Sequence, residues 1–210
     1  MKKSVSKFVS EEDREKIVKA VEEAEKTTSG EIVPMIVPFC NKYIAATQRG
    51  AFLLALLVAI AVVYFIPEVK YRYFVPIFLL GMVVFYFLVS KISFLQRLFV
   101  YAKEKEEEVS EGAMAAFYES GLYRTRDETG VLIFISVFER KVWVLADRGI
   151  NDKVDPHEWE HIVGDLGKGI KAKRQCEAIV EAIGKIGKLL QDRFPRKDDD
   201  TDELSNIIVK

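Results

Sequence analysis

The sequence predicts a small α/β domain, a few strands covered by helices, which a helical membrane hairpin interrupts after the first strand. Two uncharged apolar runs, 50–67 and 73–90, lie close together and predict the hairpin. Short apolar runs rich in β-branched residues occur before and after them and predict strands. Charged segments with apolar residues at helical spacing flank these runs and predict the covering helices.

The charge of the chain is balanced overall but unevenly distributed. Its 210 residues include 31 Lys and Arg against 32 Asp and Glu, for a formal net charge of -1. This balance excludes a dominant attraction to nucleic acid, so no nucleic-acid partner is expected. Between Arg49 and Lys91 the only charged residues are Glu68, Lys70 and Arg72. The chain therefore combines an apolar insert with a highly charged remainder.

The cysteines argue against a disulfide-rich protein or a CxxC zinc protein, and the N-terminus argues against a secreted one. Cys40 and Cys176 are too few for a disulfide framework or a CxxC zinc site. One bridge could form, but two free thiols are expected. Lys2 and Lys3 are not followed by an apolar segment, so a cleaved secretory signal is not expected.

Residues 1–45 are predicted to hold the first helix and the first strand of the domain. Ser10 followed by Asp13 resembles a capping box, and apolar residues at helical spacing then predict a helix over 10–28. The run 31–39 reads as a strand. Its two prolines lack ladder donors, which favours an edge position or irregular pairing.

The hairpin is predicted over 46–92, with spans at about 50–67 and 73–90. Each run is near the short end of what crosses a hydrocarbon core of about 30 Å. The alternative is a buried hairpin of a soluble protein, but such helices normally have a polar face and neither run has one. Six basic residues flank the spans and two lie in the turn: Lys42, Arg49, Lys91, Arg97, Lys103 and Lys105 against Lys70 and Arg72. The lipid bilayer is thus an expected partner, and the positive-inside rule predicts that the soluble parts are cytoplasmic.

Residues 93–195 are predicted to complete the domain. The three-four apolar spacing after the second span predicts one long helix to about residue 120. The run 130–138 fits a central strand buried on both faces, and a two-residue turn joins it to a strand over 141–146. Helices follow over 155–166, opened by Asp155 and Pro156, and over about 172–193. Residues 196–210 form a charged C-terminal tail.

One catalytic motif occurs, HEWEH at residues 157–161. In zinc peptidases the histidines of H-E-x-x-H bind zinc and the glutamate activates water. A third ligand would have to be a carboxylate, such as Glu177 or Glu181. The helical wheel argues against the site, because His157 and His161 lie opposite the apolar face that contains Trp159. A solvated polar face is the favoured interpretation.

Carboxylates at strand ends are the remaining candidates for chemistry. Phosphate-binding, serine-hydrolase, cysteine-phosphatase and dinucleotide signatures are absent, so no nucleotide cofactor is expected. Asp147 follows the strand 141–146, Asp127 precedes the central strand and Glu31 opens the first strand. Gathered at one end of a sheet, they could hold Ca²⁺ or Mg²⁺. The alternatives are scattered surface charge and, for Asp147, a turn-capping role.

Four segments resemble the TPM-domain family, which includes thylakoid acid phosphatase, photosystem II repair proteins and bacterial relatives. These segments are TSGEIVPMIV (28–37), TGVLIFIS (129–136), ERKVWVLADRGI (139–150) and the W-x-x-I-V at 159–163. The helix around 178–183, the Phe-Pro at 194–195 and the ELSN at 203–206 are similar to the membrane-inserted subgroup.

The resemblance implies an α/β/α sandwich with a central mixed sheet. It also implies an acidic pocket near the strand ends, which binds divalent metal in some relatives. Weak acid phosphatase activity is attributed to some members and a role in assembly or repair of membrane complexes to others. The commoner bacterial pattern has a signal peptide and an exported domain, whereas the internal hairpin and the charge bias here indicate the cytoplasm.

Three functions follow from these patterns. The favoured one is an interaction module for the assembly or maintenance of membrane complexes, with other membrane proteins as partners, because the sequence supplies no dedicated nucleophile. The alternative is a metal-dependent phosphatase at Asp147, Asp127 and Glu31. The least favoured is a zinc peptidase at His157 and His161.

Overall fold

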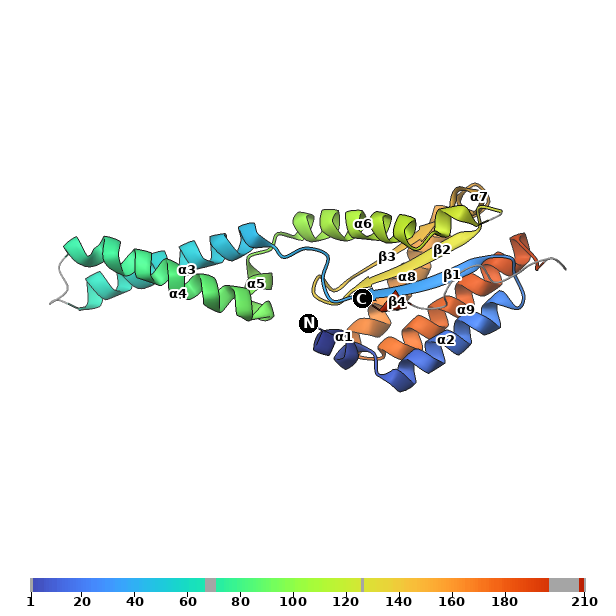
Figure 1. Cartoon of the computed structure of the whole chain (residues 1–210), viewed down its shortest axis with the longest axis horizontal. Helices are drawn as coiled ribbons and strands as arrows, with labels where there is room; N and C mark the ends of the chain where they lie inside the picture. The colour runs from blue at the N-terminus through green and yellow to red at the C-terminus, as the bar shows by residue number, and fades with distance from the viewer. Residues whose placement is uncertain (1, 67–70, 126, 197–207, 210) are drawn as a thin grey trace. The chain divides into compact units, whose positions relative to one another are not determined.

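The computed structural model describes residues 2–66, 71–125, 127–196 and 208–209. The chain divides into two compact units. The first combines residues 1–40 with 106–210, and the second contains residues 41–105. Figure 1 traces both units along the chain.

The first unit is built on a mixed sheet. Its strands are β1 (Glu31–Val37), β2 (Gly130–Ser136), β3 (Lys141–Ala146) and the two-residue β4 (Ile208–Val209). Their order is β3-β2-β1-β4. β2 runs parallel to β1 and antiparallel to β3. The apolar run of β2 is buried along its whole length, as expected for a central strand.

The pairing register brings three chain positions to one end of this sheet. Glu31 lies opposite Gly130, and Val131 lies opposite Ala146. The start of β1, the start of β2 and the end of β3 therefore share that end. This arrangement positions the acidic residues that flank these strands.

Pro34 is accommodated because its missing N–H faces away from β2. The backbone N–H of Glu31 donates to Thr129 O at 3.1 Å, whereas the next N–H, that of Ile32, donates to the buried Glu25 carboxylate at 2.9 Å. Donors alternate in direction along a strand, so position 34 points to the same side as Ile32. On that side the pairing that the structure describes, with β4, involves residues 35 and 36 of β1.

Alternate residues of β1 and β2 face two different cores. Ile32, Ile36, Val131 and Ile133 pack with helices α2 (Glu11–Glu25), α8 (Pro156–Lys171) and α9 (Gln175–Arg193). Val33, Met35, Leu132 and Phe134 pack with the buried residues of α6 (Ala102–Glu119). Figure 1 shows α6 on one side of the sheet and α2 with α9 on the other. The expected α/β layering with helices on both faces is confirmed.

Three short helices complete the first unit. They are α1 (Lys2–Phe8), the 3₁₀ turn η2 (Leu122–Arg124) and α7 (Arg148–Asn151). The predicted capping box at the start of α2 is formed, because Ser10 and Asp13 each accept from the other's backbone N–H at 3.1 Å. The helix ends at Glu25, slightly before the predicted limit of 28.

The second unit is a helical hairpin. It contains α3 (Ile44–Phe65), the 3₁₀ turn η1 (Tyr71–Tyr73), α4 (Phe74–Lys91) and the short α5 (Ser93–Leu98). Small residues allow close contact, since a Cβ at Gly81 of α4 would lie 3.1 Å from the Cβ of Ala55 on α3. Among the residues of this unit that the structure describes, two helices are long and apolar enough to cross a membrane. Only 22% and 6% of their most apolar windows are buried, unlike core helices of soluble proteins.

The prediction of one continuous helix from the second span to about residue 120 is wrong. α4 ends at Lys91, Ile92 is extended with φ -103° and ψ 98°, and a second break at Phe99 separates α5 from α6. The break at Phe99 has a visible cause, because the Arg49 guanidinium donates to Phe99 O at 2.9 Å. Contacts with α3, which is distant in sequence, thus override the helical spacing.

Candidate functional site

Asp147 lies at the end of β3 and caps α7. Its Oδ1 accepts from the Arg148 N–H at 2.7 Å, and its own N–H donates to Gly130 O at 2.8 Å. Its second carboxylate oxygen, Oδ2, is buried and has no hydrogen-bond partner within the described residues. Asp147 therefore caps the turn, which was one of the alternatives for this residue. Its second carboxylate oxygen takes no part in the cap.

Two backbone carbonyls lie close to the same turn. A Cβ at Gly149 would come within 2.9 Å of Asp127 O and 2.8 Å of Glu128 O. Only a glycine permits this approach without displacing the backbone. Glu128 itself has a positive φ of 54°, which is uncommon for a residue with a side chain. The loop before β2 and the turn after β3 are thus tightly apposed.

Glu31 and Asp127 flank the same end of the sheet. Glu31 is the first residue of β1 and is 8% exposed. Asp127 lies in the loop before β2 and is exposed. Across the ranges that the structure describes, no three Asp, Glu, His or Cys side chains converge to hold a metal ion. The fold therefore brings Glu31, Asp127 and Asp147 to one end of the sheet without assembling them as a three-residue ligand set.

The H-E-x-x-H segment lies on an exposed surface of α8. His157 and His161 are exposed, as the helical wheel predicts, and His157 Nδ1 lies 3.2 Å from Glu160 Oε2. Glu158, the residue that would activate water, accepts from the N–H of Asp155 and pairs with Arg193 at 3.0 Å. Glu158 therefore caps α8 and joins it to α9 through the ion pair with Arg193.

A buried polar cluster at the opposite end of the sheet was not predicted. Glu139 is 4% exposed, although it lies in the tight turn between β2 and β3. One of its carboxylate oxygens accepts from the Cys40 N–H at 3.0 Å and the other from the Ser136 hydroxyl. The signal available in the sequence was Ser136, the polar residue in an otherwise apolar strand.

The cysteines of the first unit are both free thiols, as expected. Burial, reinforced by the charge of Glu139, raises the pKa of Cys40 to about 12. Burial also raises the pKa of Cys176 to about 11. Both thiols are therefore protonated at neutral pH and are poor nucleophiles.

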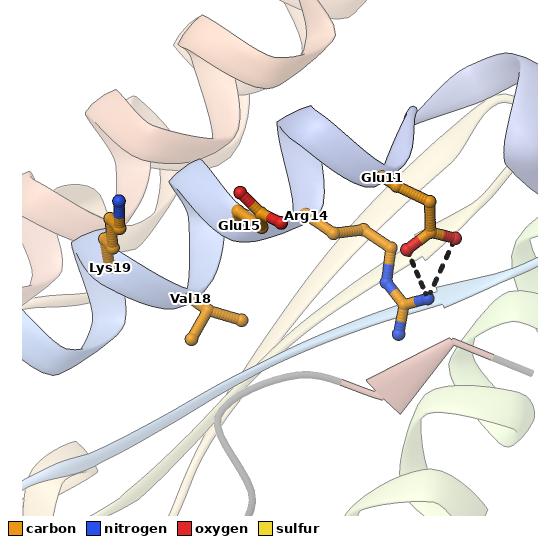
Figure 2. Close-up of a pocket in the computed structure, with 5 residues that line it drawn as sticks. All are labelled: Glu11, Arg14, Glu15, Val18 and Lys19. Carbon is orange, nitrogen blue, oxygen red and sulfur yellow. Dashed lines mark hydrogen bonds and ion pairs between the residues drawn. The ribbon is translucent and has the colours of Figure 1, made fainter.

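Figure 2 shows side chains of α2 that line a pocket. Five residues of this one helix line it: Glu11, Arg14, Glu15, Val18 and Lys19. Arg14 is paired with Glu11 at 3.2 Å. Among the described residues, none that the sequence predicted as a site lines this pocket, and those that do line it come from one helix and do not converge as catalytic groups.

Comparisons with known proteins agree with this architecture. A family model described as the TPM domain matches residues 94–189. No curated protein matches the chain. Among solved structures, the NMR structure of the BA42 protein from the psychrophilic bacterium Bizionia argentinensis matches with a TM-score of 0.61 and 22% identity. That match covers 97% of this chain and 96% of BA42, and at this identity it shows a shared fold.

The family match and the fold agree on one assignment. The matched residues begin in α5 and contain β2, β3, α8 and most of α9, which are the central strand, its hairpin partner and two covering helices. The segments that resemble TPM sequences, 129–136 and 139–150, form the paired strands β2 and β3 and the turn that carries Asp147. The chain carries a TPM domain.

Proposed function

We propose that this chain is an integral membrane protein whose TPM domain acts as an interaction module in the assembly or maintenance of membrane complexes. One observation carries the membrane part of the proposal, namely the apolar surface of the hairpin. Large apolar side chains on both α3 and α4 are exposed, such as Leu57 at 63% and Leu80 at 68%. Soluble proteins rarely expose apolar surface so continuously, whereas lipid contact would cover it.

The charge distribution supports a cytoplasmic location for the TPM domain. Six basic residues flank the hairpin in the sequence and two lie in its turn. Positive charge near the ends of membrane spans favours the cytoplasmic side. The domain and both termini would then lie in the cytoplasm.

An exposed aromatic patch on the first unit supports the interaction part. Met114 and Tyr118 of α6 are 51% and 64% exposed, and Tyr123 of η2 is 41% exposed. The rings of Tyr118 and Tyr123 lie 5.4 Å apart, and the Arg124 guanidinium lies over Tyr123. Tyrosine, methionine and arginine are the residues that protein interfaces favour. A second membrane protein is the proposed partner.

Two measurements test this function. The full chain should stay with membranes after an alkaline carbonate wash, which releases peripheral proteins. A photo-crosslinking residue at position 118 should then capture an integral membrane protein that the same residue at exposed position 171 of α8 does not capture. Release by carbonate would overturn the membrane part. Identical products at 118 and 171 would overturn the interaction part.

Divalent-cation binding at Asp147 is a second candidate function, and a bound cation could support phosphatase chemistry. The buried Oδ2 of Asp147, which has no hydrogen-bond partner among the described residues, favours it, because a buried carboxylate oxygen normally has a partner. The carbonyl oxygens of Asp127 and Glu128, close to Gly149, are of the hard oxygen type that Ca²⁺ and Mg²⁺ prefer. We therefore propose Asp147 as the carboxylate ligand of a hard cation, with the Asp127 and Glu31 side chains, which do not converge with it among the described residues, as further ligands.

A bound cation would supply Lewis-acid polarisation of a phosphoryl oxygen. Calorimetric titration with Ca²⁺ and Mg²⁺ tests binding, using Asp147→Asn, which keeps the cap but loses the charge. Asp152→Asn, an exposed substitution at the end of α7, is the matched control. Equal affinity in wild type and Asp147→Asn, or binding in neither, would leave Asp147 as a capping residue. Hydrolysis of a generic phosphomonoester, with and without the cation, tests the chemistry.

A further inference from the structure

The short helix α5 is separated from both of its neighbours by breaks in the chain. Ile92 is extended, so α5 does not continue α4, and Phe99, with φ -100° and ψ 0°, ends it. Gln96 of α5 donates to the carbonyl oxygen of Lys42 at 2.8 Å and to the Thr47 hydroxyl at 2.9 Å. These bonds fix α5 against the start of α3 (Figure 1).

An ion pair and an aromatic ring complete the attachment. The Arg49 guanidinium, which donates to Phe99 O, also pairs with the Glu104 carboxylate at 2.7 Å and lies 4.3 Å from the centre of the Tyr101 ring. The Phe99 ring covers Gly50, where a Cβ would come within 2.5 Å of it. The orientation of α5 within the second unit is therefore set by polar and apolar contacts on its inner side.

The outer side of α5 presents an apolar stripe. Phe94 and Leu98, one helical turn apart, are 68% and 63% exposed, and Tyr101 is 62% exposed. Ile44, at the start of α3, is 56% exposed. Because these contacts hold α5 in place, Phe94 and Leu98 lie on its exposed side.

We infer that α5 is an interfacial anchor, which lies at the bilayer surface with Phe94 and Leu98 at the boundary between headgroups and acyl chains. This inference rests on the membrane insertion proposed above. The stripe begins at Phe94, shortly after α4 ends at Lys91, and Ile92 between them is also exposed, so the stripe continues the apolar surface of the hairpin. Tyr101 has the amphipathic ring that favours this depth.

The charges around α5 point to lipid as the occupant of this surface. Lys91, Arg97, Lys103 and Lys105 lie within or beside it in the sequence; Lys91 and Lys103 are exposed, whereas Arg97 and Lys105 are partly buried. The first acidic residue after α4 is Glu104, which is paired with Arg49. An apolar face bordered by basic residues matches an anionic membrane surface, where the cations meet lipid headgroups and the apolar side chains enter the acyl boundary. A protein partner would not require this excess of positive charge.

Depth measurement by spin labelling tests the anchor in the full chain. Both native cysteines are replaced by alanine, and single cysteines are introduced by Phe94→Cys, Leu57→Cys and Lys171→Cys. The purified protein is placed in vesicles of phosphatidylcholine with phosphatidylglycerol. Accessibility to oxygen and to a water-soluble nickel complex then gives the depth of each label. We expect the label at 57 deep in lipid, the label at 94 at the boundary and the label at 171 in water.

The three labels separate failure of the anchor from failure of membrane insertion. A deep label at 57 with a label at 94 as accessible to nickel as that at 171 would overturn the anchor and leave insertion intact. A label at 57 in water would overturn insertion, and the anchor with it. Leu98→Cys repeats the measurement on the same stripe, so a local disturbance from one label cannot decide the result.

Discussion

At the scale of single residues, Asp147 combines a structural contact with an unused oxygen. Its Oδ1 holds the first N–H of α7, while Oδ2 is buried without a partner among the described residues. Leaving a buried polar group unsatisfied costs about 1–3 kcal/mol. A cap alone would be served by asparagine or serine without a buried charge. The choice of aspartate at this position is therefore the residue-level argument for a cation.

The capping box of α2 gives a prediction with a defined pH dependence. Hydrogen bonds from the Ser10 side chain and backbone lower the pKa of Asp13 from its ordinary value of 3.8. A lowered carboxyl pKa adds stability above the unfolded-state pKa, and that stability is lost as the pH falls through the folded-state value. We expect Ser10→Ala to lower the free energy of unfolding by about 1 kcal/mol at neutral pH and by less at acid pH.

Urea unfolding of the full chain in detergent measures this effect, with fluorescence of Trp143 and Trp159 reporting on the first unit. Ser6→Ala is the matched control, since Ser6 is exposed in α1. A difference between Ser10→Ala and wild type that does not shrink at acid pH would show that Asp13 contributes no charge-dependent bond.

The two thiols give a second residue-level prediction. Because the pKa values of Cys40 and Cys176 are raised to about 12 and about 11, few thiolates form at neutral pH. Alkylation in the folded protein should be slower than in the urea-unfolded chain by roughly 100-fold or more, since the thiolate is the nucleophile. Glu139→Gln should accelerate reaction at Cys40, because it removes the neighbouring negative charge, and leave Cys176 unchanged.

Mass spectrometry of each cysteine peptide over time gives both rates in one experiment. Cys176 serves as the internal control for general loosening of the fold. Equal acceleration of the two cysteines in Glu139→Gln would mean that the variant unfolds the domain rather than changing the electrostatics at Cys40.

At the scale of elements, apolar patterns predicted the strands well because burial on both faces leaves a clear signal. The runs at 130–138 and 141–146 contain β2 and β3, but β2 ends at Ser136, so the turn has four residues, 137–140, and the predicted two-residue turn is wrong. The break at Ile92 left no such signal, because the apolar spacing continues across it. It occurs beside contacts of α5 with residues 42–50, which lie far away in sequence.

The candidate site was predictable only in part for the same reason. Parallel pairing of β1 with β2 places Glu31, Asp127 and Asp147 at one end of the sheet, as the strand assignments imply. Whether the side chains converge depends on local turns such as the positive φ of Glu128, which single-sequence patterns do not specify. Burial of Glu139 was missed because charged turn residues are usually exposed.

Helix packing gives an element-level prediction with built-in controls. A Cβ at Gly187 of α9 would lie 2.7 Å from the Cβ of Ala24 on α2, whereas one at Gly184 would meet nothing within 4 Å. Gly187→Ala should therefore destabilise the domain by about 1–3 kcal/mol through overpacking. Gly184→Ala should stabilise it by up to about 1 kcal/mol, since alanine is the better helix former.

Urea unfolding compares the two alanine variants with wild type. The same contrast is available in α8, where Gly169 contacts Ala178 closely and Gly167 faces open space. Equal effects of Gly187→Ala and Gly184→Ala would contradict the close packing of α9 against α2.

At the scale of the whole molecule, the sheet restricts how the proposed membrane hairpin can cross the bilayer. β1 ends before the hairpin and β2 begins after it, yet the two are adjacent parallel strands of one sheet. Parallel neighbours need a long crossover connection, and residues 38–129 supply it. Because β1 and β2 belong to one sheet, the chain must return to the side of the membrane from which it left. Only an even number of spans allows this, as the two apolar helices provide.

The side on which the domain lies gives the last prediction. In a variant without native cysteines, Glu12→Cys of α2 reports on the domain and Tyr71→Cys, at an 86% exposed position between the two apolar helices, reports on the turn. An impermeant maleimide added to intact cells should label position 71 and not position 12, because the basic flanks favour the cytoplasm. Position 12 should become reactive after permeabilisation. The reverse labelling pattern would place the domain outside and overturn the orientation, whereas labelling of both positions from outside would contradict a membrane-spanning hairpin.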